Sequence, residues 1–238
     1  MKFAQFLAFV YCFFFVTVSL SAQKSPELYI GPIKPKVSIG TGIDANISIP
    51  ASKEVLRRMN SKSAGNTVFN VTYHNFPPNA KAAFQYAMDV WSAVLYTSVP
   101  VRVDAYWENT LPSGVLGSTS PGNYYRKIPG AYKYEAYYPI VLAEKIVGHV
   151  LGNPTDPDIV IHLSSTIPWY YGTDAKTPVG FYDLTTVTLH EICHGLGFTG
   201  SFYADITPTG SYGDGASKAP EIFDYFVKGI DANHPQNP

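Results

Sequence analysis

The amino-acid sequence predicts an α+β fold for one large domain preceded by an N-terminal extension. Two segments alternate polar and apolar side chains with a period of two, which is typical of half-buried strands. Two other segments place apolar side chains at three- and four-residue steps, which is typical of helices packed on a core. Glycine and proline number 19 each, so long loops are expected rather than a helical bundle.

The composition limits the classes of partner. Lys and Arg number 17 against 18 Asp and Glu, and this formal net charge of -1 argues against a dedicated nucleic-acid or polybasic membrane binder. Hydrophobic residues make up 46% of the chain, enough for a sizeable core. The sequence therefore indicates a globular protein. No pattern in it predicts the oligomeric state.

The first residues have the pattern of an export signal. Lys2 precedes an apolar run from Phe6 to Val16, and small residues follow at Ser19 to Ala22. Because the run is shorter than the roughly 20 residues that span a bilayer, we expect a signal peptide over residues 1–22. An uncleaved membrane anchor is the alternative. We expect a secreted, extracellular protein with no stable membrane span, in which Cys193 is the only remaining cysteine.

Residues 23–65 are rich in Pro, Gly, Ser and Lys, which favours a linker or a propeptide-like segment. A short amphipathic stretch at Ala51 to Met59 is expected to form a helix or a latency segment. The folded domain is expected to cover residues 66–238. Its polar, aperiodic ending is also compatible with further C-terminal domains beyond this sequence.

The first half of the domain contains the clearest periodic segments. Alternation over residues 66–73 predicts a strand. Asn79 is a suitable N-cap for a helix that reaches Leu95, with an apolar stripe for the core. A second strand is predicted over residues 100–107, with every second side chain buried.

The next segments carry weaker signals. Residues 109–137 have repeated Gly, Pro, Ser and Tyr without a sustained period, which predicts a long surface loop. Residues 139–147 predict a short helix, and residues 158–163 predict a buried strand.

Residues 183–198 form the most informative segment. Asp183 can accept backbone N–H bonds at a helix N-cap, and Gly195 and Gly197 allow the chain to leave the helix sharply. Thr and Val are mediocre helix formers, so tertiary burial must stabilise this helix.

His190, Glu191 and His194 form an H-E-x-x-H motif within that predicted helix. The two histidines are four residues apart, so both imidazoles can reach one Zn²⁺ at about 2.0 to 2.1 Å. Glu191 lies about 100° around the helix, where it can act as general base toward a zinc-activated water. Incidental histidines and a structural zinc are the alternatives. Because Glu191 has no purpose in a closed structural site, the motif favours zinc-dependent hydrolysis.

The sequence resembles the zincin metalloproteases, in particular a group of secreted bacterial zincin-like proteins with a similar H-G-L-G-F ending to the motif. The segments that carry the resemblance are Trp169–Gly172, Gly180–Tyr182, Asp183–Phe198 and Pro220–Asp224. The resemblance implies a zincin-like catalytic domain with a twisted mixed β-sheet, an active-site helix and a backing helix that residues 79–95 would supply. It also implies a protein or peptide substrate in the cleft between sheet and helix, paired with an edge strand.

The sequence departs from the metzincin pattern in two ways, so it is at best metzincin-like. Gly200 stands where metzincins place a third histidine, and no methionine follows Met88 for a Met-turn. A catalytic zinc needs a third protein ligand. Asp224 is the preferred candidate and Glu221 the next, both in a predicted helix over residues 220–227. The alternative is that both only cap or solvate that helix. The other downstream candidates are Asp205, Asp214, Asp231 and His234.

These observations predict a secreted zinc metallopeptidase that acts as an endopeptidase, with His190, His194 and Asp224 as metal ligands and Glu191 as catalytic base. A catalytically inactive zincin-fold binding or adhesion module is the first alternative, and a hydrolase acting on non-peptide amides or esters is the second. Cys193 is expected to be a buried core thiol. No role is assigned to the isolated histidines His74, His149 and His162, and any of the tyrosines Tyr170, Tyr171, Tyr182, Tyr203 and Tyr212 could supply an oxyanion hydroxyl.

Overall fold

The structure, a computed structural model, describes part of the chain. The described residues are 25–29, 37–40, 47–61, 67–201, 203–204, 210–211 and 219–227. The predicted signal peptide over residues 1–22 lies outside these ranges. Within them, no helix combines the length and apolar character that a membrane crossing requires.

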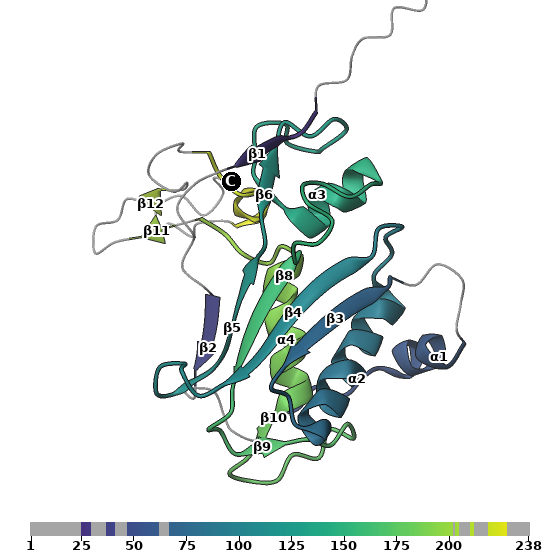
Figure 1. Cartoon of the computed structure of the whole chain (residues 1–238), viewed down its shortest axis with the longest axis vertical. Coiled ribbons are helices and arrows are strands. Elements are labelled where there is room, and N and C mark those ends of the chain that lie inside the picture. The colour runs from purple at the N-terminus through teal and green to yellow at the C-terminus, as the bar shows by residue number, and fades with distance from the viewer. Residues whose placement is uncertain are drawn as a thin grey trace, which may run out of the picture.

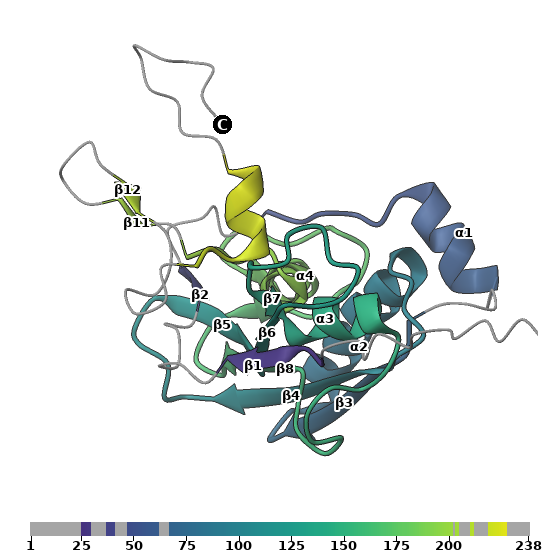
Figure 2. The same ribbon diagram turned by 90° about the horizontal axis from the view of Figure 1, so that it is seen from above.

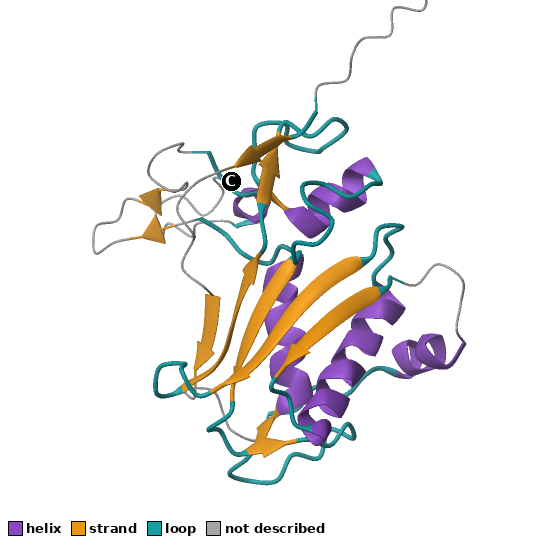
Figure 3. Ribbon diagram, in the orientation of Figure 1, coloured by secondary structure: helices purple, strands orange, loops and turns teal. Residues whose placement is uncertain are grey.

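Helices and short strands follow one another along the chain (Figure 3). The helices are α1 (Lys53–Ser61), α2 (Pro78–Val94), α3 (Ile140–Val147), α4 (Leu184–Leu196) and the 3₁₀ helix η1 (Ile222–Phe226). The strands are β1 (Glu27–Tyr29), β2 (Val37–Gly40), β3 (Phe69–His74), β4 (Val101–Glu108), β5 (Val115–Pro121), β6 (Tyr124–Arg126), β7 (Tyr138–Pro139), β8 (Ile159–Ser164), β9 (Trp169–Tyr170), β10 (Tyr182–Asp183), β11 (Tyr203–Ala204) and β12 (Gly210–Ser211). This mixture confirms the predicted α+β class.

A five-stranded mixed sheet forms the centre of the molecule, in the order β2-β5-β8-β4-β3 (Figure 1). Strands β3, β4 and β8 are parallel to one another. Strand β5 runs antiparallel to β8, and β2 runs antiparallel to β5. Strand β2 is therefore the edge strand beside β5.

Helices α2 and α4 cover one face of this sheet (Figure 2). The helices cover this face because it is apolar. In strand β4, the buried side chains are Val101, Val103, Ala105 and Trp107, while the intervening side chains are partly exposed. This alternation matches the predicted strand, and the core lies between the helices and the sheet.

Helix α2 matches the predicted segment, but its N-terminus differs. The N-cap is Pro77, which makes no side-chain cap bond, and Pro78 begins the helix. The Asn79 side chain instead accepts from the neighbouring Ala80 N–H at 3.0 Å. Proline fits the first helical position because its fixed φ is already helical and its missing N–H is not needed there.

The predicted surface loop over residues 109–137 is wrong, because this stretch contains β5 and β6. Strand β5 lies between β2 and β8, and its Leu116, Ser118 and Thr119 are buried. Small polar residues occupy both of its faces, so the strand has no alternation of apolar and polar side chains for sequence reasoning to detect.

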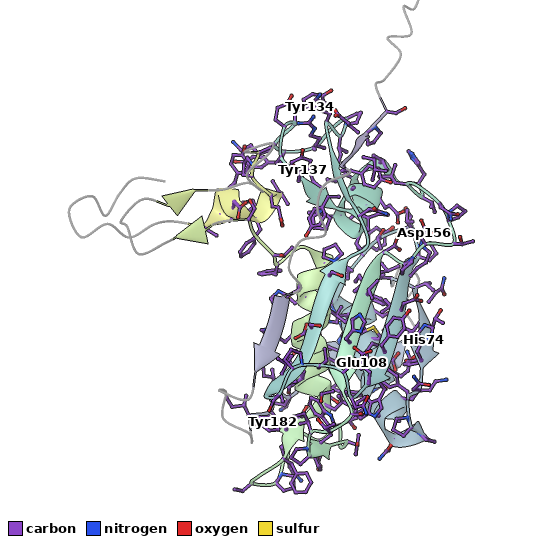
Figure 4. The ribbon with its side chains drawn as sticks, turned by 60° about the vertical axis from the view of Figure 1, so that its left-hand side comes forward. His74, Glu108, Tyr134, Tyr137, Asp156 and Tyr182 are labelled. Atoms are coloured by element: carbon purple, nitrogen blue, oxygen red, sulfur yellow. The ribbon has the colours of Figure 1, made fainter. Side chains whose placement is uncertain are left out.

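A smaller unit with β6, β7, α3 and η1 lies beyond the C-terminal end of α4 (Figure 1). The predicted helix over residues 220–227 is present as the shorter η1. Tyr137, labelled in Figure 4, connects η1 to the rest of this unit, because its N–H donates to the Pro220 carbonyl at 3.0 Å and its carbonyl accepts from Ile222 N–H at 2.8 Å. This backbone bridge fixes the position of the segment that holds Glu221 and Asp224.

Candidate functional site

Helix α4 begins and ends where the sequence predicts. Asp183 is its N-cap, and the Oδ1 atom accepts from Thr186 N–H at 2.6 Å. Gly197 ends the helix with φ of 124°, a left-handed value that favours glycine. The capped helix holds the H-E-x-x-H residues in a defined orientation.

The backbone of α4 approaches the sheet closely at Gly195. A Cβ atom there would lie 2.6 Å from Ile159 Cγ2 on β8, so no larger residue fits without a shift. Leu184, Val187 and Ile192 on the same helix are buried in the core. The opposite side of α4 therefore carries the side chains that remain accessible.

His190 and His194 converge at that accessible side. Their Nε2 atoms lie 3.0 Å apart, and the ring planes are inclined by 86°. Two nitrogens bound tetrahedrally to one zinc at about 2.0 to 2.1 Å would lie about 3.3 Å apart, so a small spreading of the rings would accommodate the ion. The same distance also fits a direct hydrogen bond between the rings.

The second nitrogen of His194 fixes its tautomer. Its Nδ1 lies 2.6 Å from the Phe198 carbonyl oxygen, which can only accept, so Nδ1–H is the donor. The neutral ring then presents the lone pair of Nε2 toward His190. A carbonyl behind the distal nitrogen is the usual support for a metal-binding imidazole.

The surroundings of His190 favour its neutral form. Its ring is accessible to solvent, yet the protein around it partly desolvates the imidazole and lowers its pKa. The neighbouring His194 lowers that pKa further. Both effects keep a lone pair available near neutral pH.

Glu191 points in a different direction from the histidines. Its side chain is fully buried, at 0% exposure, between α4 and β5. A Cβ atom on Gly117 would lie 3.2 Å from Glu191 Cγ. The carboxyl group therefore lies under β5, beside the accessible face of α4 and shielded from solvent.

The structure does not bring Asp224 to the two imidazoles. Among the described residues, no group of three or more His, Cys, Asp or Glu side chains is arranged to hold a metal ion. The Asp224 carboxylate instead accepts from Ser201 N–H at 2.9 Å, from Ser201 Oγ at 2.6 Å and from Glu221 N–H at 2.8 Å. Glu221 is also buried, and its side chain forms a reciprocal capping box with Asp224 at the start of η1. These contacts do not support the expectation that Asp224 is the third metal ligand. They support the alternative, in which Asp224 caps the helix η1.

Gly200, at the place of the metzincin histidine, has a structural reason to be glycine. A Cβ atom there would collide with Asp224 Oδ1. The remaining candidates for a third ligand lie outside the described residues, namely Asp205, Asp214, Asp231 and His234.

The other singled-out side chains lie away from the histidine pair. His74 and His162 stack on the two faces of Tyr106 on the helix-free face of the sheet, and His162 Nδ1 lies 2.8 Å from Glu108 Oε1. His74 and Glu108 are labelled in Figure 4. His149 is exposed at the end of α3.

Cys193 is half-buried rather than a fully buried core thiol, and this burial raises its pKa. Among the tyrosines, Tyr170 donates to Asp174 Oδ1 at 2.6 Å. Tyr171 and Tyr182 pack against the core. The side chains of Tyr203 and Tyr212 lie outside the described residues.

Two parts of the site were missed from the sequence. Gly117 makes room for Glu191, but it stands in a segment that was predicted to be a loop. The Phe198 carbonyl is a backbone group, so only its position four residues after His194, at the end of the helix, could have indicated it.

Comparison with known proteins found a match to one protein family. The model of a family described as SPBPB7E8-like matches residues 63–211, more than half of the chain. This region begins after α1 and includes α4, but it ends before η1. No curated protein and no solved structure matches the chain.

Proposed function

The chain belongs to the SPBPB7E8-like family, and we propose that it is a secreted zinc-dependent metallopeptidase with a zincin-like catalytic domain. The observation that supports this proposal is the pair of converging Nε2 atoms, 3.0 Å apart on one turn of a capped helix. The Phe198 carbonyl behind His194 adds to it, since it leaves the converging nitrogen free of its proton.

His190 and His194 would hold the zinc through Nε2. Zinc in such a site supplies a Lewis acid that polarises a scissile carbonyl and makes a water molecule more acidic. Glu191 is the proposed base: a carboxylate oxygen accepts the proton of the attacking water and then returns it to the leaving amine. A third protein ligand is still required, and the described residues do not supply it.

A second candidate function is an inactive zincin-like binding module. Two observations favour it: no third ligand accompanies the histidines in the described part of the chain, and Glu191 is fully buried. Such a module would keep the helix and bind a partner without hydrolysing it.

Zinc content and peptide cleavage separate these functions. The wild-type chain is expected to bind one zinc, His194→Ala to bind none, and Glu191→Gln to bind zinc normally while cleaving a denatured protein at least about 100-fold more slowly. His149 is an exposed histidine that follows α3 and is not part of the H-E-x-x-H motif, so His149→Ala is the matched control and should keep both properties. Absence of zinc from the wild type would refute the metal proposal, and zinc without cleavage would favour the binding module.

A further inference from the structure

The N-terminal strap, defined as the described residues among 25–61, is attached to the surface of the domain. Strand β1 pairs with β6, and β2 pairs with β5. Ser48 Oγ donates to Thr177 Oγ1 at 2.8 Å, and Ile49 N–H donates to Thr186 Oγ1 on α4 at 3.0 Å. Helix α1 then lies beside α2 (Figure 1). The strap thus crosses the sheet edge and reaches both central helices.

The described core of the domain consists of residues that follow the strap. Of the strap residues whose exposure is described, none is buried, and α1 contributes no buried side chain. The buried core starts with residues after Thr67, and the family match starts at residue 63. The parts of the strap whose exposure is described therefore add no buried side chain to the core, as expected for a segment that can detach.

Strand β2 occupies the edge of the sheet nearest the H-E-x-x-H helix. Ser38 pairs with Ser118 and Ile39 pairs with Gly117, so β2 lies directly across from the glycine that contacts Glu191. Regular pairing shifts between Ile39 and Gly40. Without β2, β5 would be an edge strand with unpaired N–H and C=O groups, the arrangement that recruits an extended peptide.

The same strand lies against the helix that carries the proposed base. Strand β2 contacts α4 as well as β5, and the Glu191 carboxyl group is fully buried with the strap in place. General base catalysis requires that this group reach a water molecule. The strapped chain is consequently in a form that does not suit the proposed reaction.

We infer that the strap is a self-inhibitory segment whose β2 strand occupies the β5 edge that an extended peptide substrate needs. This inference deepens the proposed function, and its regulatory meaning rests on that function. Release of β2 would open the β5 edge for antiparallel pairing with a peptide and remove the strand that flanks β5 at Gly117, beside Glu191. A chain with the strap released in one molecule out of ten would bind such a peptide about tenfold more weakly than a chain with the edge fully open.

Proline substitution in β2 tests the inference in the full chain. In an antiparallel pair, one of two consecutive residues directs its N–H toward the partner strand, so Ser38→Pro with Ile39→Pro removes a bond to β5 whichever residue donates. The matched control, Ser38→Ala with Ile39→Val, keeps both N–H groups. Amide exchange of residues 115–119 should accelerate in the proline variant and stay unchanged in the control.

Peptide affinity is the deciding measurement. The probe is a fluorescein-labelled peptide with the sequence of residues 34–42, and all chains carry Glu191→Gln so that nothing is cleaved. Fluorescence anisotropy should show at least about tenfold tighter binding to the proline variant than to the control. Equal affinities, together with faster exchange of residues 115–119, would overturn the inference.

Cleavage assays with Glu191 intact distinguish this inference from the proposed function. Tighter peptide binding with faster cleavage supports both, whereas tighter binding with no cleavage supports the strap and refutes the peptidase. If the proline variant does not fold, Ser48→Ala with Thr186→Val loosens the strap by a different route, because it removes both side-chain groups that hold residues 48 and 49. That variant should also bind the peptide more tightly. If it is folded and the amide exchange of residues 115–119 is accelerated, an unchanged peptide affinity would refute the inference.

Discussion

Gly117 of β5 and Glu191 of α4 are in direct contact, with the strand backbone lying over the buried side chain. A Cβ atom at Gly117 would be 3.2 Å from Glu191 Cγ, 3.2 Å from the His162 carbonyl oxygen and 2.9 Å from Leu163 Cδ2. The backbone at this position is not in the left-handed region, so the requirement for glycine is one of space. The β5 backbone thereby limits the position of the proposed base, Glu191.

Gly117→Ala should therefore destabilise the protein by about 1 to 3 kcal/mol, the usual cost of an added methyl group in a filled interior. It should also lower cleavage by displacing Glu191. Chemical denaturation measures the first effect, and kcat/KM on a denatured protein measures the second.

Ser120→Ala is the control on the same strand, because Ser120 is partly exposed, and it should change stability by less than about 0.5 kcal/mol. A Gly117→Ala chain as stable and as active as the control would show that β5 does not position Glu191.

Features with local signals could be predicted from the sequence, whereas contacts between distant residues such as Gly117 and Glu191 could not. The predictions for α4 and β4 succeeded because their signals are local: a cap at Asp183, a glycine at Gly197 and alternation along residues 101–107. Strand β5 was missed because its small residues serve contacts with other elements. Gly117 is close to Leu163, to the His162 carbonyl and to Glu191, and Glu191 lies 74 positions later in the chain.

The proposed metal site was predictable only in part for a similar reason. One helical turn dictates that His190 and His194 converge, so their spacing is sufficient. A third ligand would come from a distant segment. The sequence does not show which of the distant carboxylates already accept hydrogen bonds from other residues. Asp224 is held by Ser201, 23 positions earlier, through a contact that no local pattern contains.

Asp224→Ala should destabilise the protein without removing zinc. The carboxylate accepts hydrogen bonds from Ser201 N–H, Ser201 Oγ and Glu221 N–H, so its loss leaves partly or fully buried donors unsatisfied at a cost of about 1 to 3 kcal/mol. Thermal denaturation and zinc content measured on the same preparation test this prediction.

Asp224→Asn is the conservative control, because it keeps one carbonyl acceptor and should recover part of the stability. The opposite pattern, loss of zinc from both variants with little change in melting temperature, would restore Asp224 as the third ligand.

Attachment of the strap at β1 should depend on pH through Glu27. The Arg126 and Lys127 side chains each lie 2.8 Å from its carboxylate and lower its pKa from 4.5 to about 2. A carboxyl group with a lowered pKa in the folded state stabilises that state above its unfolded pKa, and the contribution is lost as the pH falls through the folded pKa. The ion pairs should therefore contribute fully above pH 4.5 and weaken progressively toward about pH 2.

Glu27→Gln is the matched variant for this effect. Amide protection of residues 25–29, corrected for intrinsic exchange, should be higher in the wild type than in Glu27→Gln at pH 6, and the two should become equal near pH 2. Because Glu27 is exposed, 0.5 M salt should reduce the difference at pH 6 as well. A difference that persisted unchanged at low pH would mean that the ion pairs do not hold β1 on β6, and that backbone pairing alone anchors this end of the strap.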